Sequence, residues 1–403
     1  MRTLLLGFLA VASLLGEPAI IEAGKAGMDP ERLSRIPARM KAYVDRGELA
    51  GVVTLVSRRG VTALLDASGY QDAESKKPMR PDSIFQIMSM TKPVCGTAIM
   101  MLVDEGKLAL ADPVEKHLPE FRGQMVVASR EGERIQLKKP SRPINIRDLM
   151  SHTSGMIANP PAGIAELYQK MTLTLAEAVR VYSQQPLEFE PGTEWRYSNP
   201  GIAALGRLVE VASGMPFEKF LEARMFQPLG MKDSFLFPPP DKTDRIVTVH
   251  AATLRAAPAT ILGGDSRAHR RGAKYSAPEF GMYSTAADLA AFYNMLRAGG
   301  LHQGQRLLSP AALRVMTSLH TGDLRAGHLP GTGFGLTWEV TRQPLGMLAL
   351  MSIGSYGHGG AFGTHGWVDP AKDLVGVFLI QHAGYSGNAK AVFMGMAGSA
   401  ISE

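Results

Sequence analysis

Apolar residues recur at helical spacing shortly after residue 28. They lie three or four residues apart, at Leu33, Ile36, Met40 and Val44. This spacing places them on one face and predicts an amphipathic helix. Asp29 and Pro30 are typical of its start, because a carboxylate caps the first turn and proline there loses no hydrogen bond. The next two runs, 52–58 and 61–68, are rich in β-branched residues and predict a hairpin.

Strand patterns return only near the C-terminus, and the chain between has mostly helical patterns. The expected strands are 336–341, 347–353, 363–368 and 374–381. The expected helices are 89–105, 174–183, 202–212, 216–225, 286–296 and 310–319. We therefore expect an α+β fold in which an antiparallel sheet, built from both ends of the chain, is flanked by the terminal helices. An all-helical domain would be inserted in the middle, with a ligand cleft between the two parts.

These patterns divide the chain into three stretches. An α/β domain would take residues 24–85 and 290–403, and the helical domain would take residues 86–289. Residues 1–23 have a basic start and a short apolar run, which is typical of a signal peptide or another N-terminal leader. The run is too short to span a bilayer, so we expect no stable membrane span. A cleaved leader predicts a periplasmic or secreted protein, and a retained one predicts a cytoplasmic protein.

Composition narrows the class of protein. Hydrophobic residues make up 45% of the 403 residues and charged residues 20%, a balance typical of a folded globular protein. The formal net charge is +6, but the basic residues are scattered and form no basic face interleaved with aromatic residues. We therefore expect no nucleic-acid partner. The single cysteine, Cys95, excludes an intrachain disulfide, and the ten histidines form no metal-binding pattern, so we expect no metal site.

The most informative local pattern is Ser89-x-x-Lys92 at the start of an apolar helix. Ser89 would lie where unpaired backbone donors and the positive end of the helix dipole favour negative charge. The spacing of three places the Lys92 amine on the same face as the Ser89 hydroxyl, within reach of a proton transfer. Lysine can act as the base only where burial or nearby cations lower its pKa. On its own, the pattern is more often a capping serine with an exposed lysine.

Two further segments of suitable chemistry follow in order. In the segment 197–199, Tyr197 can serve as a general base when cations lie near it, and Asn199 offers an amide donor. In the segment 358–361, glycines let a substrate approach the backbone closely, and an edge strand can supply an oxyanion donor. Taken singly, an interface tyrosine and an ordinary glycine turn remain the alternatives.

Together these segments resemble the three motifs of the serine β-lactamase and penicillin-binding-protein superfamily, in its class C branch. Segment 89–92 is similar to its Ser-x-x-Lys, 197–199 to its Tyr-x-Asn, and 358–360 to its Lys-Thr-Gly. The chain also resembles the carboxylesterases of family VIII from about Asp29 to its end. That wider resemblance includes the segments 93–119, 146–156, 191–193 and 281–285.

The resemblance implies a β-lactamase/transpeptidase-like fold and a role for each motif. Ser89 would be the nucleophile, with Lys92 and Tyr197 as the proton-transfer pair. The backbone N–H groups of Ser89 and Ala361 would form the oxyanion hole. The implied substrate-binding and oxyanion residues are Asn199, His358, Gly360 and Ala361. No metal and no organic cofactor is implied.

The third motif departs from the family pattern, because His358 and Gly359 replace lysine and threonine. A permanent cation that attracts a substrate carboxylate becomes an imidazole, which is mostly neutral near pH 7 by its usual pKa of roughly 6.5. We therefore expect a serine hydrolase that acts on a small-molecule ester or amide. Short-chain carboxylic esters cleaved through an acyl-serine are the favoured substrates, and β-lactam hydrolysis stays open as a side activity. The alternatives are a β-lactamase, a D-Ala peptidase or acyltransferase, and a sensor that is acylated without turnover; the oligomeric state is not predicted.

Two other features bear on the choice of nucleophile. His152 and Ser154 could be mistaken for a catalytic pair, but we expect a structural role, because Gly155 closes a helix there. We likewise expect His365 to be a strand residue or to support the site from behind. The chain has no Gly-x-Ser-x-Gly elbow, which argues against an α/β-hydrolase.

Overall fold

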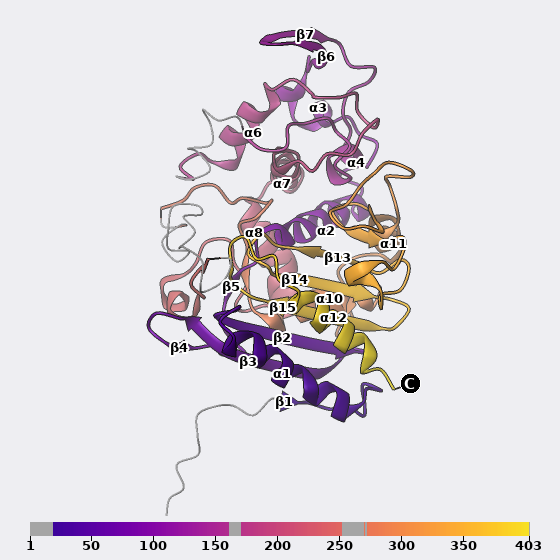
Figure 1. Cartoon of the computed structure of the whole chain (residues 1–403). Helices are drawn as coiled ribbons and strands as arrows, with labels where there is room; N and C mark the ends of the chain where they lie inside the picture. The colour runs from indigo at the N-terminus through magenta and orange to yellow at the C-terminus, as the bar shows by residue number, and fades with distance from the viewer. Residues whose placement is uncertain (1–18, 161–170, 252–269, 271, 403) are drawn as a thin grey trace, which may run out of the picture.

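The central element is an antiparallel sheet whose strands come from both ends of the chain (Figure 1). The structure is a computed structural model, and it describes residues 19–160, 171–251, 270 and 272–402. Within these residues the sheet has nine strands in the order β1-β3-β2-β15-β14-β13-β12-β11, with β4 paired to β3. Their bounds are β1 Ala19–Ile20, β2 Gly51–Arg58, β3 Val61–Asp72, β4 Lys77–Pro78, β11 Thr332–Phe334, β12 Glu339–Thr341, β13 Tyr356–Gly359, β14 His365–Asp369 and β15 Leu374–Leu379. Because β2 pairs with β15, the two ends of the chain meet in the middle of the sheet.

Both faces of the sheet are buried, and successive side chains along the central strands point alternately into two hydrophobic clusters. On β2, Val53 belongs to one hydrophobic cluster and its neighbour Val52 belongs to another. The helix α10 (Ala286–Arg297) packs on the first face, whereas α1 (Pro30–Asp45) and α12 (Ala389–Ser399) pack together on the second. Successive side chains of a strand point to opposite sides, so a continuous apolar run is buried only where both faces are covered.

The inserted part begins and ends at one place. The short strand β5 (Phe85–Gln86) before it pairs with β8 (Tyr283–Ser284) after it. The helices between them are α2 Thr91–Asp104, α3 Val114–His117, α4 Ile146–Met150, α6 Leu175–Ser183, α7 Asn199–Ser213, α8 Phe217–Leu221 and α9 Gln227–Leu229. This part is not entirely helical, because a ribbon of β6 (Val126–Glu131) and β7 (Arg134–Lys138) projects at its far end (Figure 1).

The start of α2 lies where the inserted part meets the sheet. Inside the inserted part, α2 packs against α7. On its other side it contacts α11 (Pro310–Thr317), which follows the small hairpin of β9 (Leu301–His302) and β10 (Gln305–Arg306). The turn that leads into α2 contacts β13. A side chain on this turn is therefore accessible to groups from both parts.

The chain departs from the expected strands at two places near the C-terminus. The strand predicted over 347–353 is wrong, because Gly346–Leu348 forms a 3-10 turn and Ile353 is 72% exposed. Glycines with positive φ, Gly346 and Gly354, break the backbone at both ends of this run. The strand predicted over 336–341 is shorter than expected, because a φ of +67° at Thr337 bends the chain before β12.

One expected domain limit falls inside a helix, and the end of the expected leader falls in the turn between β1 and α1. The limit between residues 289 and 290 lies within α10, which packs on β14 and β15 as one helix. Of the expected leader, residues 1–18 lie outside the described residues, whereas Ala19–Ile20 pair with β3 and Ala23 is buried. Within the described residues, no helix combines the length and the apolar character needed to cross a membrane.

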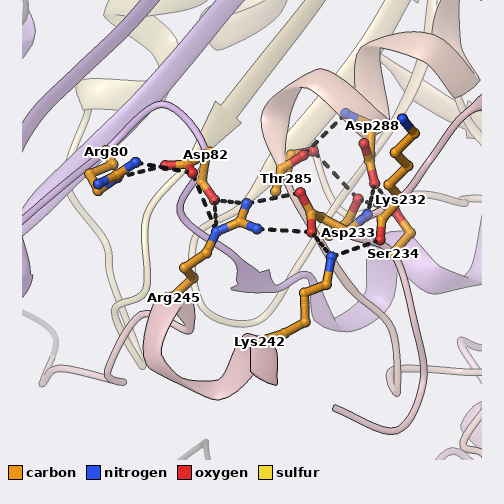
Figure 2. Close-up of polar contacts among 10 residues, drawn as sticks. Arg80, Asp82, Lys232, Asp233, Ser234, Lys242, Arg245, Thr285 and Asp288 are labelled. Carbon is orange, nitrogen blue, oxygen red and sulfur yellow. Dashed lines mark hydrogen bonds and ion pairs between the residues drawn. The ribbon is translucent and has the colours of Figure 1, made fainter. Parts of the chain in front are cut away.

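A network of ion pairs ties the end of the inserted part to the rest of the fold (Figure 2). Arg245 donates to both carboxylate oxygens of Asp233 at 2.9 Å, and also to the backbone carbonyl of Asp82. Lys242 donates to the same Asp233 carboxylate at 2.5 Å. The Asp233 backbone N–H donates to Asp288, in the first turn of α10, at 2.8 Å. Since Asp82 precedes β5 and Asp288 lies on α10, the network joins three separate segments.

Candidate active site

Ser89 lies on a short 3-10 turn, η1 (Met88–Met90), that leads into α2. The residue before it, Met88, has a φ of +51°, a conformation that a non-glycine residue keeps only when its surroundings impose it. Thr91 supplies part of this restraint, since its hydroxyl donates to the Met88 carbonyl at 2.7 Å and accepts from the Met282 N–H at 3.1 Å. The turn leaves Ser89 at the wall of a cavity while Met88 is buried.

Lys92 lies one turn further along and is completely buried. Its amine is 3.0 Å from the Ser89 hydroxyl oxygen and donates to the Glu279 backbone carbonyl at 2.8 Å. Burial lowers the Lys92 pKa from 10.5 to about 7, although the Glu279 carboxylate acts to raise it. Much of the protein therefore carries a neutral Lys92 near pH 7, and a neutral amine can accept the serine proton.

Tyr197 reaches the same serine from the segment that precedes α7. Its ring centroid is 4.6 Å from the Lys92 amine nitrogen, and its hydroxyl shares a hydrogen bond with Ser89. Burial raises the Tyr197 pKa above its usual value of 10, so the phenol is protonated in the resting site. Lys92 is thus available as a base, while Tyr197 holds a proton that a leaving group can take.

The side chains of His152 and Ser154 hold the backbone near Tyr197. The His152 ring packs 4.5 Å from the Tyr197 ring, and its Nδ1 accepts a hydrogen bond from the Ser198 N–H at 3.2 Å. The Ser154 hydroxyl oxygen accepts from the Met156 N–H at 3.2 Å. Neither residue is among those that line the cavity beside Ser89. Their contacts therefore agree with the structural role expected of them.

Asn199 is the first residue of α7 and does not line the cavity beside Ser89. Its amide nitrogen donates to the side-chain oxygen of Asn159 at 2.9 Å, and its backbone N–H donates to the Ala158 carbonyl at 2.9 Å. The amide expected to bind substrate is therefore engaged with a neighbouring loop in this structure.

The opposite wall of the site is β13 and the turn after it. Gly360 packs so closely that a Cβ there would lie 2.3 Å from the Ile87 carbonyl oxygen and 2.2 Å from the Thr364 hydroxyl. The Gly360 N–H donates to the Thr364 carbonyl at 2.8 Å, which closes the turn. Ala361 follows at the cavity wall, and within the described residues its N–H makes no backbone hydrogen bond. This N–H is therefore available beside Ser89 as an oxyanion donor.

His358 carries no positive charge at neutral pH. The side chain is buried, and this burial lowers its pKa to about 3. Its Nδ1 lies 2.7 Å from the Gly359 carbonyl oxygen, so Nδ1 holds the hydrogen and donates it. The residue at the position of the motif lysine is therefore a neutral imidazole.

The cavity has a volume of about 290 Å³, and four polar residues that line it belong to none of the three motifs. They are His328, Glu339, His365 and Lys390. His365 lies on β14, as the strand residue that the sequence led us to expect. Glu339 accepts hydrogen bonds from the His328 N–H and, at 2.9 Å, from its Nδ1. Although burial acts to raise the Glu339 pKa, these bonds and the electrostatic effect of His328 lower it to about 2. No motif spacing links these residues, because they lie on β12, β14, α12 and a loop.

Four other cavities among the described residues contain none of the predicted site residues. A larger cavity of about 600 Å³, lined by residues between 218 and 239, contains none of the predicted site residues. Among the described residues, no group of three or more His, Cys, Asp or Glu side chains is placed to hold a metal ion.

The fold, and the contact of a cavity-lining serine and tyrosine with a buried lysine, define a serine hydrolase of the β-lactamase and penicillin-binding-protein type. The Beta-lactamase family profile matches residues 36–397, and the chain belongs to this family. The predicted family and fold are therefore confirmed. The structure brings Ser89, Lys92 and Tyr197 together, and their catalytic roles stay predictions.

Relatives and solved structures refine the branch of the family. Esterase EstB of Burkholderia gladioli is 31% identical over 401 residues, which cover 90% of this chain and 95% of EstB. Uncharacterized protein MT1414 of Mycobacterium tuberculosis is 32% identical over 362 residues, which cover 86% of this chain and 89% of MT1414. The solved structure of EstCE1 is described as a hydrolase with promiscuous acyltransferase activity. It is 27% identical and superposes with a TM-score of 0.78, and the match covers 93% of this chain and 99% of EstCE1. EstB and EstCE1 support the family VIII esterase branch.

Proposed function

We propose that this protein is a carboxylesterase that hydrolyses short-chain esters through an acyl intermediate on Ser89. The observation that carries the proposal is the 3.0 Å contact between the Ser89 hydroxyl and the buried Lys92 amine. Because burial lowers the pKa of this amine to about 7, it can take the serine proton as the oxygen attacks the ester carbonyl.

The proposed reaction assigns each proton transfer to a named group of the site. When the Ser89 oxygen bonds to the carbonyl carbon, its proton passes to Lys92, and the N–H groups of Ser89 and Ala361 stabilise the oxyanion. The tetrahedral intermediate then expels the alkoxide, which takes a proton from Tyr197, and Lys92 returns a proton to Tyr197. Water next attacks the acyl group and loses a proton to Lys92. Collapse of the second intermediate releases the acid and returns the proton to the Ser89 oxygen.

The third motif itself lacks the cation of typical β-lactamases. A penicillin carries a carboxylate, and the neutral His358 offers that carboxylate no positive charge at the position of the motif lysine. The names of EstB and EstCE1 describe an esterase and a hydrolase, which also supports ester hydrolysis by this chain.

The experiment compares wild type with Ser89→Ala on p-nitrophenyl acetate, p-nitrophenyl butyrate and nitrocefin, in steady state and in a single turnover. Ser386→Ala is the matched control, because Ser386 is exposed and is not among the residues that line the Ser89 cavity. We expect the wild type and Ser386→Ala to hydrolyse the p-nitrophenyl esters and Ser89→Ala to lose that turnover. The ratio of nitrocefin to ester turnover then distinguishes a β-lactamase from an esterase.

Two outcomes would contradict the proposal. Ester turnover that persists undiminished in Ser89→Ala would exclude Ser89 as the nucleophile. A burst that stops after one equivalent of nitrophenol, with a stable adduct on Ser89, would indicate a sensor that is acylated without turnover.

A further inference from the structure

Lys390, the second residue of α12, places a cation in the wall of the Ser89 cavity. Its side chain is only partly exposed, yet within the described residues its amine makes no hydrogen bond and no ion pair. The amine nitrogen lies 4.0 Å from the point where a Cβ on Gly359 would be. Because Gly359 has no side chain, the space in front of the amine is open beside the third motif.

The groups around Lys390 do not neutralise it by direct contact. Glu339 is the nearest source of negative charge, but its carboxylate is engaged by the backbone and ring N–H groups of His328. Burial lowers the pKa of His365 well below its usual range and that of His358 to about 3, so both imidazoles are neutral. A single lysine amine therefore faces the cavity beside two neutral rings. Burial lowers the pKa of this amine and Glu339 acts to raise it, and a bound carboxylate would favour its charged form further.

A second polar group is directed to the same point. His365 pairs with Gly359 across β13 and β14, and its Nδ1 lies 3.4 Å from the Cβ point on Gly359. This Nδ1 is buried and has no hydrogen-bond partner within the described residues. In the neutral tautomer that carries its hydrogen on Nδ1, His365 is a donor like Lys390. Leaving two buried donors unpaired is unfavourable, so an acceptor bound between them would stabilise both.

We propose that Lys390, assisted by His365, binds a carboxylate carried by the substrate, so that the enzyme prefers esters of this acidic class to neutral esters of equal length. The inference rests on the proposed ester hydrolysis and names its substrate class. Since the neutral His358 cannot supply a cation, α12 supplies one from a different element of the fold. A charge-assisted hydrogen bond from an ammonium to a carboxylate is stronger than one between neutral groups.

The carboxylate can belong to the acyl group or to the alcohol of the ester, and two matched pairs of substrates separate these cases. The acyl pair is the p-nitrophenyl monoester of adipic acid against the p-nitrophenyl ester of adipamic acid, whose distal group is a neutral amide. The alcohol pair is 3-acetoxybenzoate against 3-acetoxybenzamide. Within each pair the scissile ester is the same and only the charge of the distal group differs.

The measured quantity is the ratio of kcat/KM for the acidic substrate to kcat/KM for its neutral partner, in wild type, Lys390→Gln and Lys390→Arg. We expect Lys390→Gln to lower this ratio by roughly tenfold in at least one pair, since a partly buried charge pair is lost. Lys390→Arg, which keeps the charge, should stay within about threefold of wild type. Added salt should lower the wild-type ratio, because a partly exposed charge is screened.

The outcomes separate this inference from the proposed function. If wild type turns over the neutral esters and the ratio is the same in Lys390→Gln for both pairs, the carboxylate site is wrong and the esterase stands. If wild type turns over none of the esters, the esterase proposal fails, and titration with adipate and benzoate tests the site alone. Weaker binding to Lys390→Gln than to wild type would then support the site, and equal binding would overturn it.

Discussion

Replacing Lys92 with methionine should stabilise the protein below pH 7 while abolishing ester hydrolysis. The amine is completely buried, and burial lowers its pKa from 10.5 to about 7. Methionine is a flexible apolar side chain of similar length that does not titrate. The substitution therefore removes both the proposed base for Ser89 and the free-energy cost of burying an ionisable amine.

The magnitude follows from the two pKa values. The Lys92 pKa is 10.5 in the unfolded chain and about 7 in the folded chain. At ~1.4 kcal/mol for each pKa unit, burying the protonated amine lowers the free energy of unfolding by roughly 5 kcal/mol at low pH. The hydrogen bond that the amine makes to the Glu279 carbonyl is lost in the variant, which offsets about 1–2 kcal/mol. We therefore expect Lys92→Met to raise the free energy of unfolding by about 3 kcal/mol near pH 6.

The sign of the pH dependence is fixed by which state holds the proton. Between pH 7 and 10.5 the unfolded chain binds the Lys92 proton and the folded chain does not, so this group makes wild-type stability rise with pH. Below about pH 7 the amine is protonated in both the folded and the unfolded chain, and the full destabilisation from its burial is present. This destabilisation disappears as the pH rises to about 10.5. Methionine contributes no such slope, so the advantage of the variant should disappear by about pH 9.5.

Urea unfolding of wild type and Lys92→Met, followed by tryptophan fluorescence at about pH 6 and about pH 9.5, measures this difference. Lys41→Met is the matched control, because Lys41 lies exposed on α1. The same variants are assayed for p-nitrophenyl butyrate hydrolysis, in which wild-type kcat/KM should rise through a pH of about 7. Identical pH dependences of stability in wild type and Lys92→Met would refute the assignment of a neutral, buried Lys92.

The remaining predictions concern the backbone of the site and the ion-pair network. Gly360→Ala should lower kcat/KM for p-nitrophenyl butyrate by roughly 100-fold, because its Cβ would lie 2.3 Å from the Ile87 carbonyl and displace the turn from Ser89. At Gly359→Ala the nearest atom would be 3.4 Å away, so the loss should stay below about tenfold, and equal losses would contradict the packing argument. Asp233→Asn should lower the free energy of unfolding in urea by about 2 kcal/mol, because Arg245 and Lys242 lose the Asp233 carboxylate and Arg245 keeps only its longer ion pair with Asp82. The exposed Asp241→Asn is its control, and a loss below about 0.5 kcal/mol in Asp233→Asn would mean that solvent screens the network.

Short-range patterns in the sequence determined the main elements and the order of the motifs. Asp29 accepts hydrogen bonds from the first turn of α1 at 2.9 and 3.1 Å, as a capping carboxylate is expected to do. The β-branched runs form β2 and β3, which pair as the predicted hairpin. Ser89 and Lys92 meet because residues three apart share a helix face, so this contact needs no information from elsewhere in the chain.

Only the tertiary structure decided which other side chains share the cavity and which of them are charged. Glu339, His365 and Lys390 come from three separate elements, and no spacing in the sequence links them to Ser89. The lowered pKa of Lys92 depends on burial, which the fold produces by placing residues such as Glu279 against it.

The strand prediction over 347–353 was wrong because burial depends on the tertiary structure and not on the local sequence. Its apolar residues are compatible with packing, but in the folded chain Ile353 is exposed, with no layer to cover it. Local propensity and periodicity act over a few residues, so the sequence by itself determined helices, strands and motif geometry. Burial and electrostatics act between residues that are distant in the chain, so the charge and the contents of the site were decided by the tertiary structure.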